Sequence, residues 1–311
     1  MRLVSQDTPD LEIAARRLLA SGPAFGIDLS LLWGVPDPAG GVRQACLAVL
    51  GAGRTSMLFV SEPSRGGDPG GAELALSERT ACVKAACSGL FEQFGTRVQV
   101  AQALPDVREA WAIQAYRAAG LQSVGDLTYL RRAPASLHEP LLTLPRGLEL
   151  VRHSKVPDAD ARLLEALQAS YEDTLDCPEL CGLREPIDIL DSHRATGKFD
   201  PNYWWLLLHE GQPAGCVLLN QCPEQRTVEL VYIGLATSVR GKRLSRPLLA
   251  HAIREAARVH PDWAVTCAVD ERNTPAKKLY ERLGFHGFAH RTALVSRLDG
   301  ALSSTSSQLG L

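Results

Sequence analysis

The stretch 229–246, ELVYIGLATSVRGKRLSR, joins an apolar run to a short basic loop and then to the start of a helical pattern. Apolar residues dominate 227–236, which predicts a strand. From Leu244 to Ala256, apolar side chains recur at helical spacing, which predicts a helix over 244–259. Pro247 is compatible with that helix because it lies in the first turn. The stretch therefore predicts a strand that passes through a basic loop into a helix.

This basic loop has the chemistry of an anion site. The first backbone amides of a helix have no intrahelical acceptor, and the helix dipole favours negative charge there. Four cationic side chains accompany these amides: Arg240, Lys242, Arg243 and Arg246. Together they favour a diphosphate ligand. A solvated charged turn is an equally common explanation of the same residues.

The surrounding pattern predicts a mixed α/β layer. Strands are expected at 148–153, 204–209, 214–219 and 263–269, with a hairpin turn at 210–213. Helices are expected at 158–171, 185–195 and 274–283, the last ended by Gly284.

The N-terminal half repeats this order less clearly. Helices are expected at 9–20 and 78–94 and before Gly120, and strands at 30–33, 44–49, 56–60 and 98–103. The segment 112–120, AIQAYRAAG, aligns with 276–284, AKKLYERLG. Chance similarity of helix ends is one explanation, but the shared element order favours duplication. We expect an N-terminal domain over 1–133, a linker with three prolines over 134–146, a C-terminal domain over 147–298 and a flexible tail over 299–311.

Composition excludes several classes of protein. The chain has 311 residues, of which 45% are hydrophobic and 22% charged, and these values fit a two-domain globular protein. A net charge of −2 makes nucleic acid an unexpected partner. No apolar run reaches the length of a membrane span, so we expect a cytoplasmic protein without a membrane partner. Cys177 and Cys181 lack a second Cys/His pair at zinc-site spacing, so no metal is expected.

Three segments resemble the GNAT superfamily of N-acetyltransferases over 148–298. They are the strand at 229–235, the loop beginning at Arg240, and 273–285, NTPAKKLYERLGF. The resemblance implies an α/β fold with two tandem GNAT-like domains, each a mixed, mostly antiparallel central sheet flanked by helices. Arg243 and Ser245 stand where the family usually has Gly and Gly or Ala. Since Gly permits close approach of the backbone to a pyrophosphate, Arg243 puts coenzyme affinity in doubt.

The resemblance also implies acetyl-CoA as cosubstrate. The positions expected to bind it are Ile233, Gly234, Leu235, Arg240, Gly241, Lys242, Arg243, Leu244, Ser245, Arg246, Asn273 and Lys278. Gly234 is a candidate bulge or splay point beside the pantetheine arm, or a packing requirement, and the Leu235 amide is a candidate donor to the thioester oxygen. Asn273 is expected to cap the helix that follows it, and this role is compatible with coenzyme contact.

Two residues are candidates for proton transfer. Glu229 is the acidic residue of an apolar strand, where desolvation would raise its pKa toward that of a general base. A strand-end carboxylate facing water is the alternative. Tyr280 matches the family tyrosine that acts as general acid near the coenzyme sulfur, whereas a buried tyrosine bonded to a backbone carbonyl is the competing explanation.

The N-terminal half is expected to be degenerate. Its glycine-rich stretch, 66–71, is interpreted as a flexible connection, and 56–60 lacks an isolated carboxylate, although Tyr116 is retained. The expected activity is acetyl transfer from acetyl-CoA to a primary amine of a small molecule or peptide. A non-catalytic acyl-CoA-binding regulatory protein is the alternative. Possible neighbours of the acceptor are Tyr171, 173–176, Trp204 and Trp205, although core packing explains the tryptophans equally well.

Overall fold

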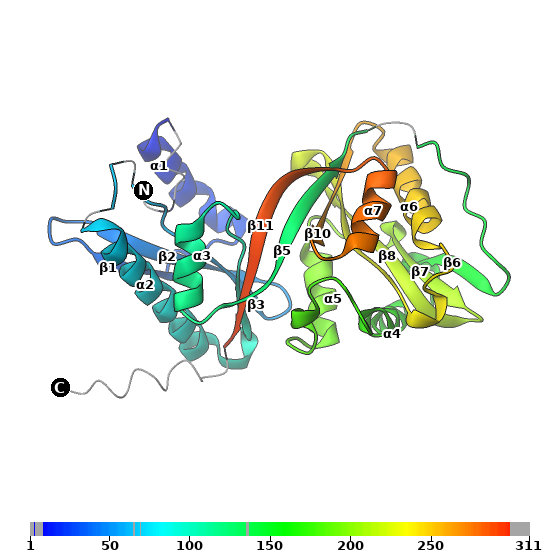
Figure 1. Cartoon of the computed structure of the whole chain (residues 1–311), viewed down its shortest axis with the longest axis horizontal. Helices are drawn as coiled ribbons and strands as arrows, with labels where there is room; N and C mark the ends of the chain where they lie inside the picture. The colour runs from blue at the N-terminus through cyan, green and yellow to red at the C-terminus, as the bar shows by residue number, and fades with distance from the viewer. Residues whose placement is uncertain (1–2, 4–8, 65, 69, 135–136, 299–311) are drawn as a thin grey trace. The chain divides into compact units, whose positions relative to one another are not determined.

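The computed structural model describes Leu3 and residues 9–64, 66–68, 70–134 and 137–298, which fall into two compact units (Figure 1). Unit 1 consists of Met1–Val124 and Arg291–Leu311, and unit 2 of Gly125–His290. The predicted tail, 299–311, lies outside the described residues. Each unit is a mixed α/β layer, as the sequence predicts.

The sheet of unit 2 is mixed and mostly antiparallel. Its strands, in spatial order, are β5 (Gln122–Arg132), β10 (Ala264–Asp270), β9 (Thr227–Leu235), β8 (Gln212–Cys222), β7 (Trp204–His209) and β6 (Leu148–Arg152). All neighbours are antiparallel except β9 and β10, which are parallel. A parallel pair needs a crossover connection, and the helix α6 (Ser245–Val259) supplies it.

Helices cover both faces of this sheet. Trp204 and Leu206 of β7 pack with Leu163 of α4 (Ala159–Tyr171) and Leu190 of α5 (Pro186–Ala195). The alternate residues of β7 and β8 pack instead against α6 and α7 (Thr274–Arg282). Since successive side chains of a strand point to opposite faces, α4 and α5 lie on one face and α6 and α7 on the other.

Unit 1 repeats the same pattern with fewer elements. Its helices are α1 (Leu11–Ser21), α2 (Gly71–Phe94) and α3 (Ala110–Ala118). Its strands, in order, are β1 (Leu32–Pro36), β2 (Val42–Gly51), β3 (Thr55–Val60), β4 (Val100–Ala103) and the end of β11 (His286–Arg297). Only β3 and β4 are parallel, and α2 connects them. The crossover β3–α2–β4 thus corresponds to β9–α6–β10, as expected for a duplicated chain.

Short 3-10 helices occur in both units. They occupy Gly22–Phe25, Gly95–Arg97, His153–Lys155, Pro178–Leu180, Pro201–Tyr203, Pro223–Gln225 and Thr237–Val239.

The two halves exchange their closing strands. β5, from the N-terminal half, pairs with β10 in unit 2, and the end of β11 pairs with β4 in unit 1. The predicted boundaries 1–133, 134–146 and 147–298 follow chain order, whereas the compact units do not. The segment predicted as a linker, 134–146, is not a free connection between domains, because Leu137, Leu142 and Leu144 pack against the core of unit 2.

Candidate active site

The parallel strands β9 and β10 separate in the middle of the unit 2 sheet. They pair only at Ala264 with Thr227, Val265 with Val228, and Thr266 with Glu229. Beyond Thr266, β10 continues to pair with β5, and β9 continues to pair with β8. The register against β8 skips Val231, so a β-bulge lies where the separation begins. The irregularity therefore precedes Gly234, the position at which the sequence suggested it.

Gly234 meets a packing requirement. A Cβ atom there would lie 2.5 Å from the Tyr232 hydroxyl and 2.7 Å from Ser170 Oγ. These two hydroxyl groups hydrogen-bond to each other at 2.8 Å, and the Tyr171 ring contacts the Tyr232 ring edge to face. Packing against Tyr232 and Ser170 therefore explains why this position is a glycine.

Glu229 occupies the last position of β9 that pairs with β10. Its half-buried carboxylate accepts a hydrogen bond from the hydroxyl of Thr266, its register partner on β10. Burial raises the pKa of Glu229, and the Thr266 hydrogen bond offsets part of that rise. Sequence reasoning missed Thr266, although it is the polar residue in the apolar run 263–269.

Tyr280 lies on the other face, among the buried residues that α7 packs against the sheet. Burial raises the pKa of its hydroxyl well above the ordinary value, and Cys267, Asp176 and Tyr232 add to that rise. Its counterpart in unit 1, Tyr116, donates a hydrogen bond to the Leu58 carbonyl at 2.8 Å. Within the described residues no such partner is found for the Tyr280 hydroxyl.

Cys267 connects the two candidate catalytic residues. Its side chain is buried beside Tyr280, and the charge of Glu229 adds to the effect of burial in raising the pKa of the Cys267 thiol. Cys267 directly follows Thr266, the register partner of Glu229, and its thiol in turn adds to the rise in the pKa of Tyr280, so both candidates lie near this residue of β10.

The start of α7 is fixed by two side-chain hydrogen bonds. Asn273 caps the helix by accepting from the Ala276 amide at 3.2 Å, which confirms the predicted cap. The Asp176 carboxylate accepts from the Asp270 amide at 3.0 Å, so the segment after α4 is joined to the end of β10. Asp176 thereby joins the segment 173–176 to this site.

The loop before α6 has a left-handed backbone at two positions, with φ of 77° at Gly241 and 58° at Arg243. Arg243 stands at the family's glycine position, and a non-glycine residue in this conformation costs about 1–2 kcal/mol. Arg240 holds the loop in place. Its guanidinium donates to the carbonyls of Leu235 at 2.9 Å and Ser170 at 2.8 Å.

The remaining predicted coenzyme residues surround this loop and α7. Leu244 precedes the helix without a side-chain cap, so the first amides of α6 keep their donors. Arg243, Ser245, Arg246 and Lys278 line one cavity of about 910 Å³. Lys242 is exposed on the loop, and Ile233 and Leu235 lie on β9 beyond the section that pairs with β10.

The two tryptophans belong to the core. Trp204 and Trp205 are 0% and 1% exposed, and Trp204 Nε1 donates to Asn220 Oδ1 at 2.7 Å. The core-packing interpretation of these residues is therefore confirmed.

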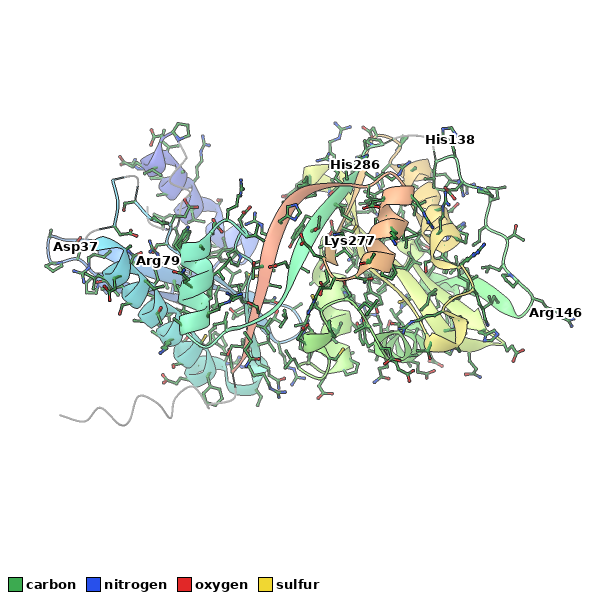
Figure 2. All side chains as sticks on the ribbon, viewed as in Figure 1. Asp37, Arg79, His138, Arg146, Lys277 and His286 are labelled. Carbon is green, nitrogen blue, oxygen red and sulfur yellow. The ribbon has the colours of Figure 1, made fainter. Side chains whose placement is uncertain are left out.

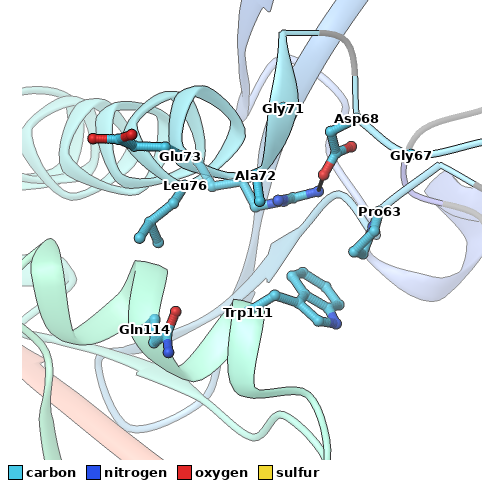
Figure 3. A pocket seen from close by; sticks show the side chains of 10 residues that line it. Pro63, Gly67, Asp68, Gly71, Ala72, Glu73, Leu76, Trp111 and Gln114 are labelled. Atoms are coloured by element: carbon cyan, nitrogen blue, oxygen red, sulfur yellow. Dashed lines mark hydrogen bonds and ion pairs between the residues drawn. The ribbon is translucent and has the colours of Figure 1, made fainter.

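The corresponding crossover in unit 1 differs from its prediction. α2 begins at Gly71 rather than at Glu78, so the glycine-rich stretch leads directly into the helix. The sequence suggested a long connection because glycine is usually a helix breaker. A cavity of about 550 Å³ lies at this helix start, lined by Asp68, Arg79 and Trp111 among others (Figure 3). Arg79 pairs with the Asp68 carboxylate at 2.8 Å, and its guanidinium lies 5.0 Å from the centre of the Trp111 ring.

No metal site and no membrane span are found in the described part of the chain. It contains no group of three potential ligands among His, Cys, Asp and Glu. None of its helices combines the length and hydrophobicity needed to cross a membrane.

Comparison with known proteins finds a family match within unit 2. Residues 165–285 match the Acetyltransferase (GNAT) family, and this range contains Glu229, the α6 loop and Tyr280. Unit 2 thus contains a segment similar to the acetyltransferase domain of that family.

The chain is 30% identical over 182 residues to mycothiol acetyltransferase of Streptomyces griseus. That match covers 58% of this chain and 56% of the relative, so it spans little more than half the length of either.

Solved structures show the same fold. A GCN5-related N-acetyltransferase from Sphaerobacter thermophilus superposes with a TM-score of 0.60 at 18% identity, covering 92% of this chain and 85% of that one. A tandem GNAT protein from the clavulanic acid biosynthesis pathway superposes with a TM-score of 0.52 at 16% identity, covering 86% and 82%. The predicted tandem GNAT fold is therefore confirmed.

Proposed function

We propose that the protein is an N-acetyltransferase that moves the acetyl group of acetyl-CoA to a primary amine of a small molecule or peptide. The observation that carries this proposal is the separation of β9 and β10 directly beyond Glu229, with Tyr280 on the opposite face. The site thereby offers a desolvated carboxylate and a protonated hydroxyl on two sides of one opening in the sheet.

The residues around that opening fit an extended acyl-thioester carrying phosphates. The free edge of β9 offers backbone groups of Ile233 to Leu235 to an amide-containing arm. The first amides of α6 and the side chains of Arg243 and Arg246 offer donors to a diphosphate. Arg240 fixes the loop between these two parts by donating to carbonyls at the end of β9 and in α4, so we assign it a positioning role.

Acetyl-CoA supplies the acetyl thioester when it is bound. An attacking amine must be neutral, and Glu229 accepts its proton directly or through a water molecule. Thr266 donates to one carboxylate oxygen, so the other oxygen remains free to accept that proton. Tyr280 keeps its proton at neutral pH because its pKa is raised, and it can therefore donate to the departing sulfur.

Two measurements test this proposal in sequence. Calorimetry with acetyl-CoA measures binding, and its absence at millimolar coenzyme would refute every acyl-CoA function of this chain. Release of free coenzyme is then measured over a panel of small amines and peptides. Binding without release for any amine would instead support the non-catalytic regulatory protein, for which the left-handed Arg243 is the one favourable observation.

A further inference from the structure

A row of four side chains crosses unit 2 on the face of the sheet that carries Glu229. Asn220 of β8 is the register partner of Glu229 on one side, and Thr266 of β10 is its partner on the other. Thr266 pairs in turn with Arg131 of β5. Paired residues of neighbouring strands project to the same face, and the hydrogen bond between Thr266 and Glu229 agrees with this. The row therefore runs across four adjacent strands, in the order Asn220, Glu229, Thr266 and Arg131.

This row is closed at one end and open at the other. Asn220 is 0% exposed, and its amide donates to two carbonyls at the C-terminal end of α5, each at 2.6 Å, so that α5 covers it. Glu229 and Thr266 are half-buried, and Arg131 is exposed. Exposure thus increases from β8 towards β5, and across the strands the accessible side of Glu229 is the side of Arg131.

The row carries two opposite charges that do not pair with each other. In the part of the chain that the structure describes, Arg131 forms no ion pair. Neighbouring strands lie about 4.8 Å apart, so about 10 Å separates the backbones of Glu229 and Arg131, which are two strands apart. A ligand that satisfies both charges has an amine at one end and an acidic group at the other, with several bonds between them.

A second row, beside the first, is apolar. Ala268 of β10 pairs with Tyr129 of β5, and each lies two residues from a member of the first row. The Tyr129 ring contacts the ring of Phe288 edge to face, and Phe288 lies on β11, the next strand of the sheet (Figure 1). Phe288 is 59% exposed. An aliphatic spacer between the two ends of a ligand would cover apolar surface here that otherwise faces water.

We propose that the acetyl acceptor is a primary amine that carries an acidic group, and that Arg131 binds this group while Glu229 faces the amine. A guanidinium binds a carboxylate or a phosphate through two parallel hydrogen bonds, so either acidic group fits this position. The inference rests on the proposed function, because it assigns the substrate class of the same site.

The exchange of strands explains why Arg131 escaped the sequence analysis. Arg131 falls within 1–133, the predicted N-terminal domain, for which no part in the chemistry was expected. Pairing of β5 with β10 brings it into unit 2, two strands from Glu229. The N-terminal half thereby supplies a residue that selects the substrate of the C-terminal half.

The test compares three primary amines of similar length, of which δ-aminovalerate and aminobutyl phosphate are acidic and δ-aminovaleramide is uncharged at that end. Release of free coenzyme measures kcat/KM for each amine with the wild type, with Arg131→Gln and with Arg146→Gln as the control. Arg146, labelled in Figure 2, is exposed and precedes β6, at the opposite edge of the unit 2 sheet. Thermal unfolding and calorimetry with acetyl-CoA check that each variant is folded and binds the cosubstrate.

The wild type should prefer at least one of the acidic amines over the amide by about tenfold in kcat/KM, as charge-assisted hydrogen bonds to the substrate imply. The acid with the larger preference identifies the group that Arg131 binds. Arg131→Gln should abolish the preference, and the control should keep it.

Three outcomes would overturn the inference. Equal wild-type values for the acids and the amide would do so and leave the proposed function standing. A parallel loss for all three amines in Arg131→Gln, with the preference intact, would show that Arg131 has only a structural role. Absence of coenzyme release with all three amines would also overturn the inference, and the wider amine panel then decides the proposed function separately.

Discussion

Replacement of Glu229 by Gln should lower turnover while raising stability. The amide oxygen of Gln can still accept the Thr266 hydrogen bond, so the geometry at the separation of β9 and β10 is retained. What is lost is the proton acceptor, and general-base catalysis typically contributes about 10²- to 10⁴-fold. The loss should be largest below the pKa of the amine substrate, where the amine depends on the enzyme for deprotonation.

The effect on stability has the opposite sign. Burial raises the folded-state pKa of Glu229, so folding favours the protonated carboxyl. The stabilisation of this form is complete at low pH and is lost as the pH rises through the raised pKa. At neutral pH the ionised Glu229 is therefore a cost that Gln removes, and the advantage of the variant should disappear on acidification.

Steady-state rates between pH 5 and 9 and chemical denaturation at pH 4 and 7 measure both effects. The wild-type kcat/KM should rise with pH, and the apparent pKa of this rise should lie above the ordinary pKa of a glutamate. Glu229→Gln should lack this rise. Glu165→Gln, at an exposed position of α4, is the matched control and should change neither quantity. A variant with wild-type turnover at every pH would refute the assignment of Glu229 as base.

Three further substitutions test other parts of the structure. Tyr280→Phe should lower kcat about a hundredfold with coenzyme affinity retained, whereas the matched Tyr116→Phe should cost only about 1 kcal/mol of stability; equal kcat values for the two variants would contradict the role of Tyr280 as acid. Asp68→Ala should destabilise the protein by about 3–5 kcal/mol, because it leaves Arg79 buried and unpaired; denaturant unfolding measures this, and a loss below about 1 kcal/mol would show that the pair is solvated. Gly234→Ala should cost about 1–3 kcal/mol, because its Cβ displaces Tyr232 from Ser170; an unchanged unfolding midpoint would mean that Tyr232 moves without penalty.

Much of unit 2 could be predicted because its signals are local. The helix and strand boundaries around Glu229, the α6 loop and the Asn273 cap follow from periodicity and from residues a few positions apart. The partners that complete the site are distant in sequence. Thr266 meets Glu229 only through the β9 and β10 register, and Glu139 meets Arg246 only because the segment 137–144 packs against the core of unit 2.

The exchange of closing strands could not be predicted from the sequence either. β5 and β11 each follow a helix that ends in a similar segment, so local pattern assigns each strand to its own half. Pairing with β10 or with β4 is decided by register and side-chain packing between distant strands, and neither is encoded in the period of a single strand.

The arginines beside the two crossover helices, α2 and α6, are paired differently, and this difference explains why catalysis is expected in unit 2 alone. Both crossovers place a helix start after a strand, and both carry an arginine near that helix start. In unit 1, the Asp68 carboxylate already neutralises Arg79, and both side chains are almost fully buried, so an incoming phosphate would have to displace an internal anion. In unit 2, Arg243 has no ion-pair partner among the described residues, and Arg246 pairs with the Glu139 carboxylate while its own side chain remains 46% exposed. A diphosphate can compete for a half-exposed arginine far more easily than for a buried one, because the exposed pair is weakened by solvent. Both units thus keep a helix start after a strand, and we infer that the position of one carboxylate decides which of the two can accept a phosphate.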